Sequence, residues 1–126
     1  MKIEGEVFTG MGVGQEYLEL EPYQRKIEEI TGFRPFPGTL NLRTDEEKVK
    51  EVLEESEAFR IESFDYSGES YSGIDVYPAK IGEVKVAVLR MDVTDYGPEV
   101  VEVVAEEKLR DQLGLEDGDS VVVRFE

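Results

Sequence analysis

Three glycines at alternate positions, Gly10, Gly12 and Gly14, form the first group of residues that could do chemistry. Glycine has no Cβ atom, so such a backbone can approach a ligand closely and direct N–H groups at phosphate oxygens. The spacing differs from the dinucleotide-binding fingerprint, and no Gly-Lys-Ser/Thr follows as in a P-loop. The residues therefore leave two interpretations open, a phosphate-binding loop and a tight turn of a β-barrel.

A hydroxyl and an amide oxygen stand two residues apart at Thr39 and Asn41, directly after a proline–glycine pair. On a strand these two side chains project to the same side. Two neutral oxygens suit a Mg²⁺ ion whose other ligands are phosphate and water. The alternative, which the residues alone favour, is a proline–glycine turn in which Asn41 bonds to its own backbone.

Glu102 stands out among the thirty acidic residues because valines flank it on both sides. Strand alternation places Glu102 on the same side as Val100 and Val104, so we expect it to face inward. An inward-facing carboxylate needs a partner or a function. Thr94 precedes it in a polar stretch over residues 92–98, which predicts an exposed loop leading into this strand.

Two basic residues, Lys108 and Arg110, follow the same strand. They are suited to screening phosphate groups at the start of a helix. The commoner arrangement is that they simply pair with the neighbouring carboxylates of Glu106 and Asp111. Both interpretations stay open at this point.

The 126-residue chain has 40% hydrophobic residues and neither cysteine nor histidine. This excludes disulfides, thiolate zinc sites and histidine-based catalysis, so any metal must be a hard ion held by oxygen. A net charge of −16 without a basic cluster argues against nucleic acid or an anionic membrane as a partner. No apolar stretch has the roughly 20 residues of a membrane helix, and no signal peptide is recognisable. We therefore expect a cytoplasmic protein, and the oligomeric state stays open.

The patterning predicts a scaffold that is mainly β, in a single domain over residues 1–126. Strands are expected over residues 2–9, 61–66, 71–81, 84–89, 100–104 and 120–125, and one more after the proline–glycine turn that precedes Thr39. Ser67-Gly68 and Gly82-Glu83 have the composition of hairpin turns.

Two or three short helices complete the scaffold. They are expected over residues 22–31, with Gly32 as the C-cap, over 44–53 and over 105–113. Thr44 and Glu47 form a capping-box pattern at the start of the second. So few helices cannot cover a parallel sheet, and a small closed β-barrel fits better than a doubly wound sheet.

Three motifs occur in a specific order: Gly-x-Gly-x-Gly over residues 10–14, Pro-Gly-Thr-Leu-Asn-Leu over 37–42, and Val-Val-Glu-Val-Val with Lys-Leu-Arg-Asp-Gln-Leu-Gly over 100–114. Together they make the chain resemble the archaeal CTP-dependent riboflavin kinases from Ile3 to Val123. The resemblance implies a six-stranded β-barrel of the cradle-loop type. Some members of that family carry an additional N-terminal helix-turn-helix domain. This sequence starts directly at the barrel, so we expect the single-domain form.

The resemblance further implies a Mg²⁺-dependent reaction in which CTP phosphorylates the ribityl 5′-hydroxyl of riboflavin, giving FMN and CDP. It assigns nucleotide binding to residues 10–15 and 107–110, the metal to Thr39 and Asn41, and the flavin to Thr94 and Glu102. The complete nucleotide set is Gly10, Met11, Gly12, Val13, Gly14, Gln15, Glu107, Lys108, Leu109 and Arg110. Some relatives are expected to have a basic residue where this chain has Gln15, so one positive charge near phosphate is missing.

Phosphoryl transfer requires mainly alignment and charge neutralisation, which a protein without histidine or cysteine can provide. We expect Glu102 to orient the attacking hydroxyl or to accept its proton. One alternative is a barrel that binds a flavin or a nucleotide without catalysis, and another is a transcription-factor barrel of the swapped-hairpin kind. The aromatic residue that contacts the flavin ring is open among Phe33, Phe36, Tyr71 and Tyr77.

Overall fold

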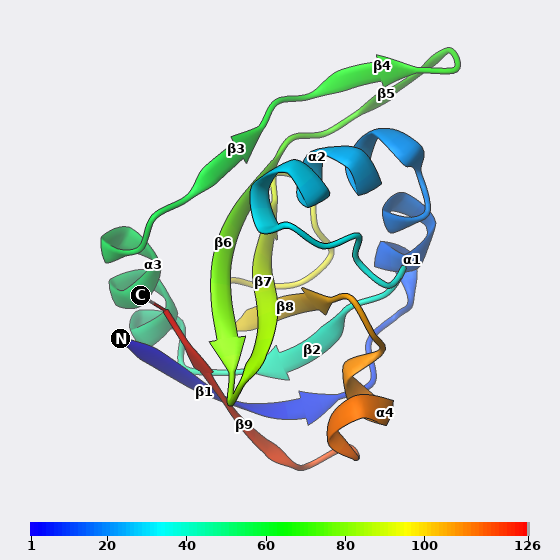
Figure 1. Ribbon diagram of the computed structural model, residues 1–126. Helices are drawn as coiled ribbons and strands as arrows, with labels where there is room; N and C mark the ends of the chain where they lie inside the picture. The colour runs from blue at the N-terminus through cyan, green and yellow to red at the C-terminus, as the bar shows by residue number, and fades with distance from the viewer. Residues whose placement is uncertain (126) are drawn as a thin grey trace.

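The computed structural model describes residues 1–125, and at Val13 and Gly14 it describes the backbone alone. Its main feature is a closed ring of six antiparallel strands (Figure 1). The ring runs in the order β6 (Ile74–Ile81), β7 (Val84–Met91), β8 (Val100–Ala105), β2 (Leu40–Arg43), β1 (Lys2–Phe8) and β9 (Ser120–Arg124). A pairing of Lys80 with Arg124 joins β9 back to β6. The expected six-stranded β-barrel is confirmed.

Three further strands lie outside the ring. β3 (Phe59–Ile61) pairs with β6, while β4 (Phe64–Tyr66) and β5 (Glu69–Tyr71) form a separate hairpin that projects from the barrel (Figure 1). Ser67 and Gly68 both have positive φ, 51° and 83°, as the predicted two-residue turn requires. The strands expected over 61–66 and 71–81 are each interrupted, because short breaks separate β3 from β4 and β5 from β6.

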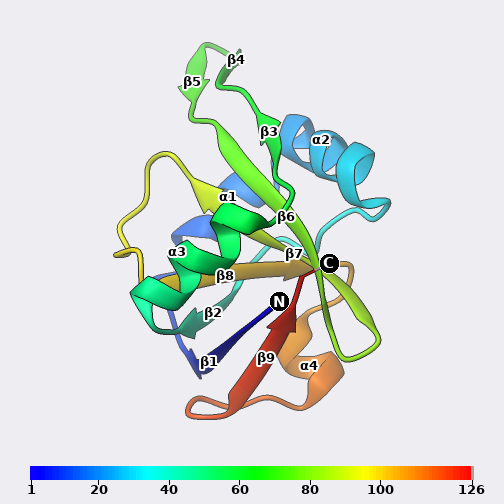
Figure 2. The same ribbon diagram turned by 90° about the vertical axis from the view of Figure 1, so that its left-hand side faces the viewer.

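The barrel interior is filled by alternate residues of the ring strands. On β1 these are Ile3 and Val7, and on β8 they are Val101, Val103 and Ala105. Helix α3 (Glu46–Glu55) lies against the barrel (Figure 2). Its buried residues Val49, Val52 and Leu53 belong to the same cluster. The two termini meet, since the Phe125 N–H donates to the Met1 carbonyl at 2.8 Å.

A second apolar layer covers the outside of β6, β7 and β8. Helices α1 (Val13–Leu18) and α2 (Glu21–Thr31) lie there, with Leu18, Tyr23 and Ile27 packed near Leu89 and Val104. The predicted helix over 22–31 is confirmed with one more residue at its start, and Gly32 caps it in the left-handed conformation, with φ 86°. Both faces of β8 are therefore buried, which explains why nearly all of its residues are apolar.

Helix α1 is the element that the sequence analysis missed, so the described residues contain four helices where two or three were expected. The expected helix over 105–113 is also too long. Ala105 still belongs to β8 and accepts the Phe36 N–H at 2.8 Å, so only α4 (Leu109–Leu113) is helical. Within residues 1–125, no helix has the length and apolarity needed to cross a bilayer.

The start of α3 differs from the predicted capping box. Asp45 is the N-cap, and its carboxylate accepts the Glu47 and Lys48 N–H groups. Thr44 instead bonds to the Glu99 carbonyl through its own N–H and its hydroxyl. Thr44 still belongs to the strand side of the junction, so the helix begins one residue later than the pattern indicated.

Candidate active site

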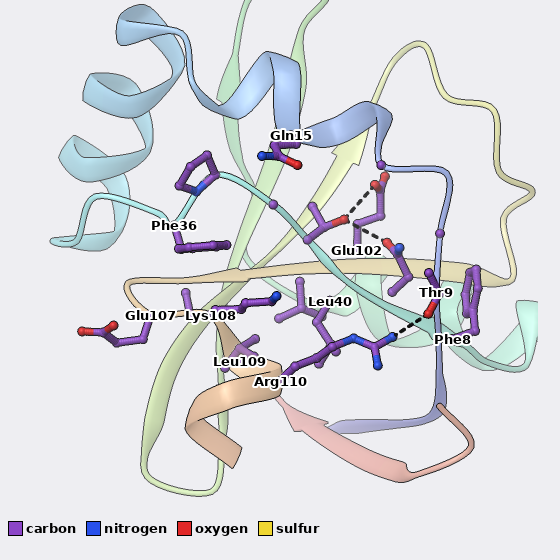
Figure 3. A pocket seen from close by; sticks show the side chains of 18 of the residues that line it. Phe8, Thr9, Gln15, Phe36, Leu40, Glu102, Glu107, Lys108, Leu109 and Arg110 are labelled. Carbon is purple, nitrogen blue, oxygen red and sulfur yellow. Dashed lines mark hydrogen bonds between the residues drawn. The ribbon is translucent and has the colours of Figure 1, made fainter. Parts of the chain in front are cut away.

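Three oxygen-bearing side chains meet on the wall of the barrel. Asn41 lies directly opposite Glu102 where β2 pairs with β8, and both residues are buried, with 7% of their surface exposed. The Thr39 hydroxyl donates to Asn41 Oδ1 at 2.9 Å and to Glu102 Oε1 at 3.4 Å (Figure 3). Thr39 and Asn41 thus share a side, as predicted, and the interpretation in which Asn41 bonds to its own backbone is wrong.

The face on which Glu102 lies corrects one expectation. Glu102 alternates with Val101 and Val103, which belong to the barrel interior, and shares its side with Val104, which packs on the outer layer. Its carboxylate therefore lies on the outer wall and does not face into the barrel. It is buried because β8 is covered on both faces, a fact that alternation alone does not reveal.

The surroundings of Glu102 change its acidity. Burial raises the pKa of this carboxyl group above the usual glutamate value, while the Thr39 hydrogen bond and the positive charge of Arg90 oppose the rise. A glutamate with a raised pKa is a better proton acceptor than an exposed one once it is ionised. The described part of the chain has no buried side-chain nitrogen or oxygen without a hydrogen-bond partner.

A cavity of about 300 Å³ opens beside this cluster. Figure 3 shows Gln15 of α1 on one side of it, and Lys108 and Arg110 at the start of α4 on the opposite side. Most residues predicted for the nucleotide and the metal line it together with Glu102: Gly10, Gly12, Gln15, Thr39, Asn41, Glu107, Lys108, Leu109 and Arg110. Residues far apart in the sequence are thus brought to one chamber.

The glycine segment forms the edge of this cavity and leads into α1 instead of turning into another strand. Gly12 is the N-cap of α1 with φ 76°, a left-handed conformation that glycine adopts without strain. A Cβ atom at Gly10 would overlap Asn41 Nδ2 and the Tyr96 hydroxyl. Met11, also predicted for the nucleotide, does not line the cavity and is 60% exposed. For Val13 and Gly14, the other two residues predicted there, only the backbone is described.

The two basic residues do not pair with Glu106 and Asp111, the partners that the sequence suggested. Arg110 donates to Asp117 Oδ1 at 2.6 Å and to the Thr9 hydroxyl at 3.3 Å, and not to Glu106 or Asp111. The hydrogen bonds from Arg110 and Thr9 hold the pKa of Asp117 below its usual value. Among residues 1–125, Lys108 takes part in no ion pair, so its charge is available to the cavity.

Thr94 lines a second, smaller cavity of about 230 Å³, and not the first one. Both cavities are lined by Glu102 and Tyr96. The second cavity lies under the loop that joins β7 to β8, with Arg90 and Pro98 also on its walls. The predicted nucleotide and flavin residues are therefore separated into two chambers that meet at Glu102.

Sequence analysis overlooked Tyr96, although an aromatic residue in a polar loop between Thr94 and Glu102 was a usable signal. It also left the aromatic flavin contact open. Phe36 lines the first cavity, Phe33 is buried in the outer layer, Tyr71 packs edge-on against Tyr23, and Tyr77 packs on the interior cluster. Within the described residues, none of these four lines the second cavity.

The structure is thus a small β-barrel with two adjoining cavities on its outer wall. A family model named CTP-dep_RFKase, with the description "Domain of unknown function DUF120", matches residues 7–125. Proteins named riboflavin kinase are similar over 98–99% of the chain. The protein of Methanocella arvoryzae is 40% identical, that of Archaeoglobus fulgidus 39% and that of Pyrobaculum aerophilum 39%. The chain belongs to the CTP-dep_RFKase family.

The relatives are longer than this chain. It covers 56%, 54% and 60% of the three proteins named above, so it spans little more than half of their length. The family match over residues 7–125 includes every residue that lines the two cavities and all six ring strands, except the first five residues of β1.

Proposed function

We propose that this chain transfers the γ-phosphoryl group of CTP to the ribityl 5′-hydroxyl of riboflavin, giving FMN and CDP. The observation that carries the proposal is the position of Glu102, a buried carboxylate at the point where two cavities meet. Donor and acceptor must lie in line on either side of the transferred group, and two adjoining chambers suit that requirement. The names of the relatives support riboflavin as the acceptor, and the family name supports CTP as the donor.

The first cavity is the proposed nucleotide site. The backbone of Gly10 and Gly12 lines one side, and the Lys108 and Arg110 side chains offer positive charge on the other. The net charge of −16 does not exclude a triphosphate, because exposed charges further than about 8 Å away are largely screened at physiological salt. Local groups in contact with the phosphates therefore decide binding.

The second cavity is the proposed acceptor site, with Thr94 and Glu102 facing the ribityl chain. Glu102 takes the proton of the terminal hydroxyl as that oxygen bonds to the γ-phosphorus. The bond between the γ-phosphorus and the bridging oxygen breaks, and CDP leaves with that oxygen. The raised pKa of Glu102 favours its role as the proton acceptor.

Thr39 and Asn41 are the proposed Mg²⁺ residues, and their chemistry fits a hard ion. The Thr39 hydroxyl and Asn41 Oδ1 lie 2.9 Å apart, beside a carboxylate, so that oxygen donors converge there. The described residues contain no cluster of three or more acidic side chains able to hold a metal by themselves. Phosphate and water would complete the shell, and the bound ion would neutralise phosphate charge.

The experiment that tests this function incubates the purified protein with riboflavin, MgCl₂ and one of four nucleoside triphosphates. FMN is separated by chromatography and detected by its fluorescence. We expect FMN with CTP and little with ATP, GTP or UTP. Excess EDTA should abolish the reaction, and added Mg²⁺ should restore it.

Two outcomes would contradict the proposal in different ways. Binding of riboflavin or CTP without any FMN would favour a barrel that only binds its ligands. FMN formation that survives EDTA would leave the kinase assignment intact and remove the metal from it.

A further inference from the structure

The loop between β7 and β8 runs from one cavity to the other. It carries Thr94, which lines the second cavity, and Tyr96, which is half-buried and lines both. Glu102 and Tyr96 are the two residues that the cavities share. Glu102 is fixed within a strand, whereas Tyr96 lies on a loop, so its position depends on the contacts that it makes.

Tyr96 contacts the glycine segment and the end of β1, the strand that leads into it. Its hydroxyl accepts the Met11 N–H at 2.8 Å, and its ring packs edge-on against Phe8 with the centroids 6.0 Å apart. The same hydroxyl lies so close to Gly10 that a Cβ atom there would overlap it. Movement of the glycine segment therefore moves the tyrosine hydroxyl or breaks its hydrogen bond.

On its other side, Tyr96 is tied to the flavin-side threonine, because its N–H donates to the Thr94 hydroxyl at 3.1 Å. Both ends of the loop are fixed independently. Arg60 holds the Asp92 carboxylate with two hydrogen bonds, of 2.7 and 2.5 Å. Arg90 donates to the Pro98 and Val100 carbonyls. With the ends fixed, the Tyr96 hydroxyl is the link between the middle of the loop and the glycine segment.

We propose that Tyr96 is a positioning residue that couples the two cavities, an inference that rests on the function proposed above. A nucleotide that orders the glycine segment also orders Tyr96, and with it Thr94, so riboflavin then has less to order when it binds. Linkage then requires riboflavin to raise the affinity for the nucleotide by the same factor as the nucleotide raises the affinity for riboflavin. The coupling passes through one hydroxyl oxygen and one backbone N–H.

The test is the affinity of riboflavin with and without a nucleotide that cannot react. Titration calorimetry measures the riboflavin Kd alone and with saturating CDP and Mg²⁺. In the unmodified protein we expect CDP to lower this Kd at least about fivefold, the low end of ordinary coupling. In Tyr96→Phe, which keeps the ring and removes the hydroxyl, the ratio of the riboflavin Kd values without and with CDP should approach one.

Tyr66→Phe is the matched control, because Tyr66 lies on the projecting hairpin and is 40% exposed. Tyr66→Phe also loses its phenolic oxygen, but the ratio of the riboflavin Kd values without and with CDP should stay as in the unmodified protein. An equal ratio in Tyr96→Phe and the unmodified protein would overturn the inference, as would a ratio of one in the unmodified protein. Failure of the unmodified protein to bind riboflavin or CDP would instead overturn the proposed function, and the inference with it.

Hydrogen exchange gives a second measurement that needs no variant. Riboflavin alone should slow exchange of the Met11 amide, although Met11 lies on the glycine segment and outside the second cavity. An unchanged exchange rate with riboflavin bound would contradict the coupling even if Tyr96→Phe proved unstable.

Discussion

Glu102 loses most of its hydration on β8, and only one hydroxyl group and the charge of Arg90 offset that loss. A buried carboxylate with so little compensation destabilises the fold once it is ionised. Its position at the junction of the two cavities gives a functional reason for a carboxylate at this destabilising position. The same residue is therefore expected to contribute to turnover and to reduce stability, and each effect can be measured separately.

Glu102→Gln keeps the shape of the side chain and removes its ability to accept a proton. We expect kcat for FMN formation to fall by about 10²- to 10⁴-fold, the usual contribution of a general base. The Kd for CTP should change much less, because the amide still fills the same space. Steady-state kinetics and calorimetry measure the two quantities. A variant with unchanged kcat would remove Glu102 from the mechanism.

The raised pKa of Glu102 also predicts how stability depends on pH. Below the unfolded-state pKa near 4.5, both states hold the proton and the residue has no net effect. As pH rises through the higher folded-state pKa, the folded state must ionise a buried group and loses stability. The stability of Glu102→Gln relative to the unmodified protein should therefore rise between pH 4 and pH 8.

Urea unfolding at several pH values measures this difference. Glu54→Gln on the exposed side of α3 is the control, and its difference from the unmodified protein should stay nearly flat. If the stability difference between Glu102→Gln and the unmodified protein did not change with pH, the pKa of Glu102 would not be raised in the folded protein.

At the scale of elements, the register between β2 and β8 builds the site. Pairing of Asn41 with Glu102 places the amide and the carboxylate on the outer wall, with Leu42 and Val101 on the inner side. A slip of one residue would reverse every side chain of the strand and would bury Glu102 in the barrel. The apolar interior therefore fixes the polar site, because the correct register is the one that keeps valine and leucine inside.

Helix α3 supports the interior without touching either of these cavities. Asp45→Ala removes its N-cap and should lower the free energy of unfolding by about 1 kcal/mol, since two backbone N–H groups lose their acceptor. FMN formation at 25 °C should stay unchanged. Urea unfolding and the FMN assay measure the two effects, with Glu54→Ala as an exposed control. A loss of FMN formation without a loss of stability would contradict the purely structural role assigned to α3.

At the scale of the whole molecule, charge is distributed unevenly. Four exposed cations occupy opposing positions on neighbouring strands, Lys85 with Lys80, Lys80 with Arg124, and Arg124 with Lys2. Within residues 1–125 none of them belongs to an ion pair. Like charges directly opposite each other destabilise a sheet, so this row is a repulsive patch on an otherwise acidic protein.

Lys80→Glu should reverse that repulsion, because position 80 lies opposite both Lys85 and Arg124. We expect Tm to rise by about 2 °C at low ionic strength and the gain to shrink in 1 M NaCl. Lys50→Glu makes the same change of charge on α3, where Glu46 and Glu54 are four residues away, and should lower Tm. Thermal unfolding at two salt concentrations measures the Tm of both variants. A fall in Tm for Lys80→Glu would show that repulsion among these cations does not destabilise the sheet.

Local patterns were sufficient for much of the fold. The hairpin at Ser67-Gly68, the helix ending at Gly32 and the strand over residues 84–89 all depend on residues near in sequence, so their patterns predict them. Helix α1 was missed because it is only six residues long and begins with Val13 and Gly14, which have low helix propensity. It is stabilised instead by packing of Leu18 in the outer apolar layer. Asp45 and Thr44 are adjacent potential caps, and only the path of the chain decides between them.

The sequence by itself determined which residues have the chemistry to bind an anion or a hard cation and remain candidates for it, because glycine, hydroxyl, amide and carboxylate chemistry does not depend on the fold. It also determined the barrel class through its strand pattern. Only the tertiary structure decided that Glu102 lies on the outer wall, that Thr94 faces a separate cavity, and that Tyr96 joins the two. These facts depend on contacts between residues as far apart as Met11 and Tyr96, and no local pattern of side chains specifies contacts over such a separation.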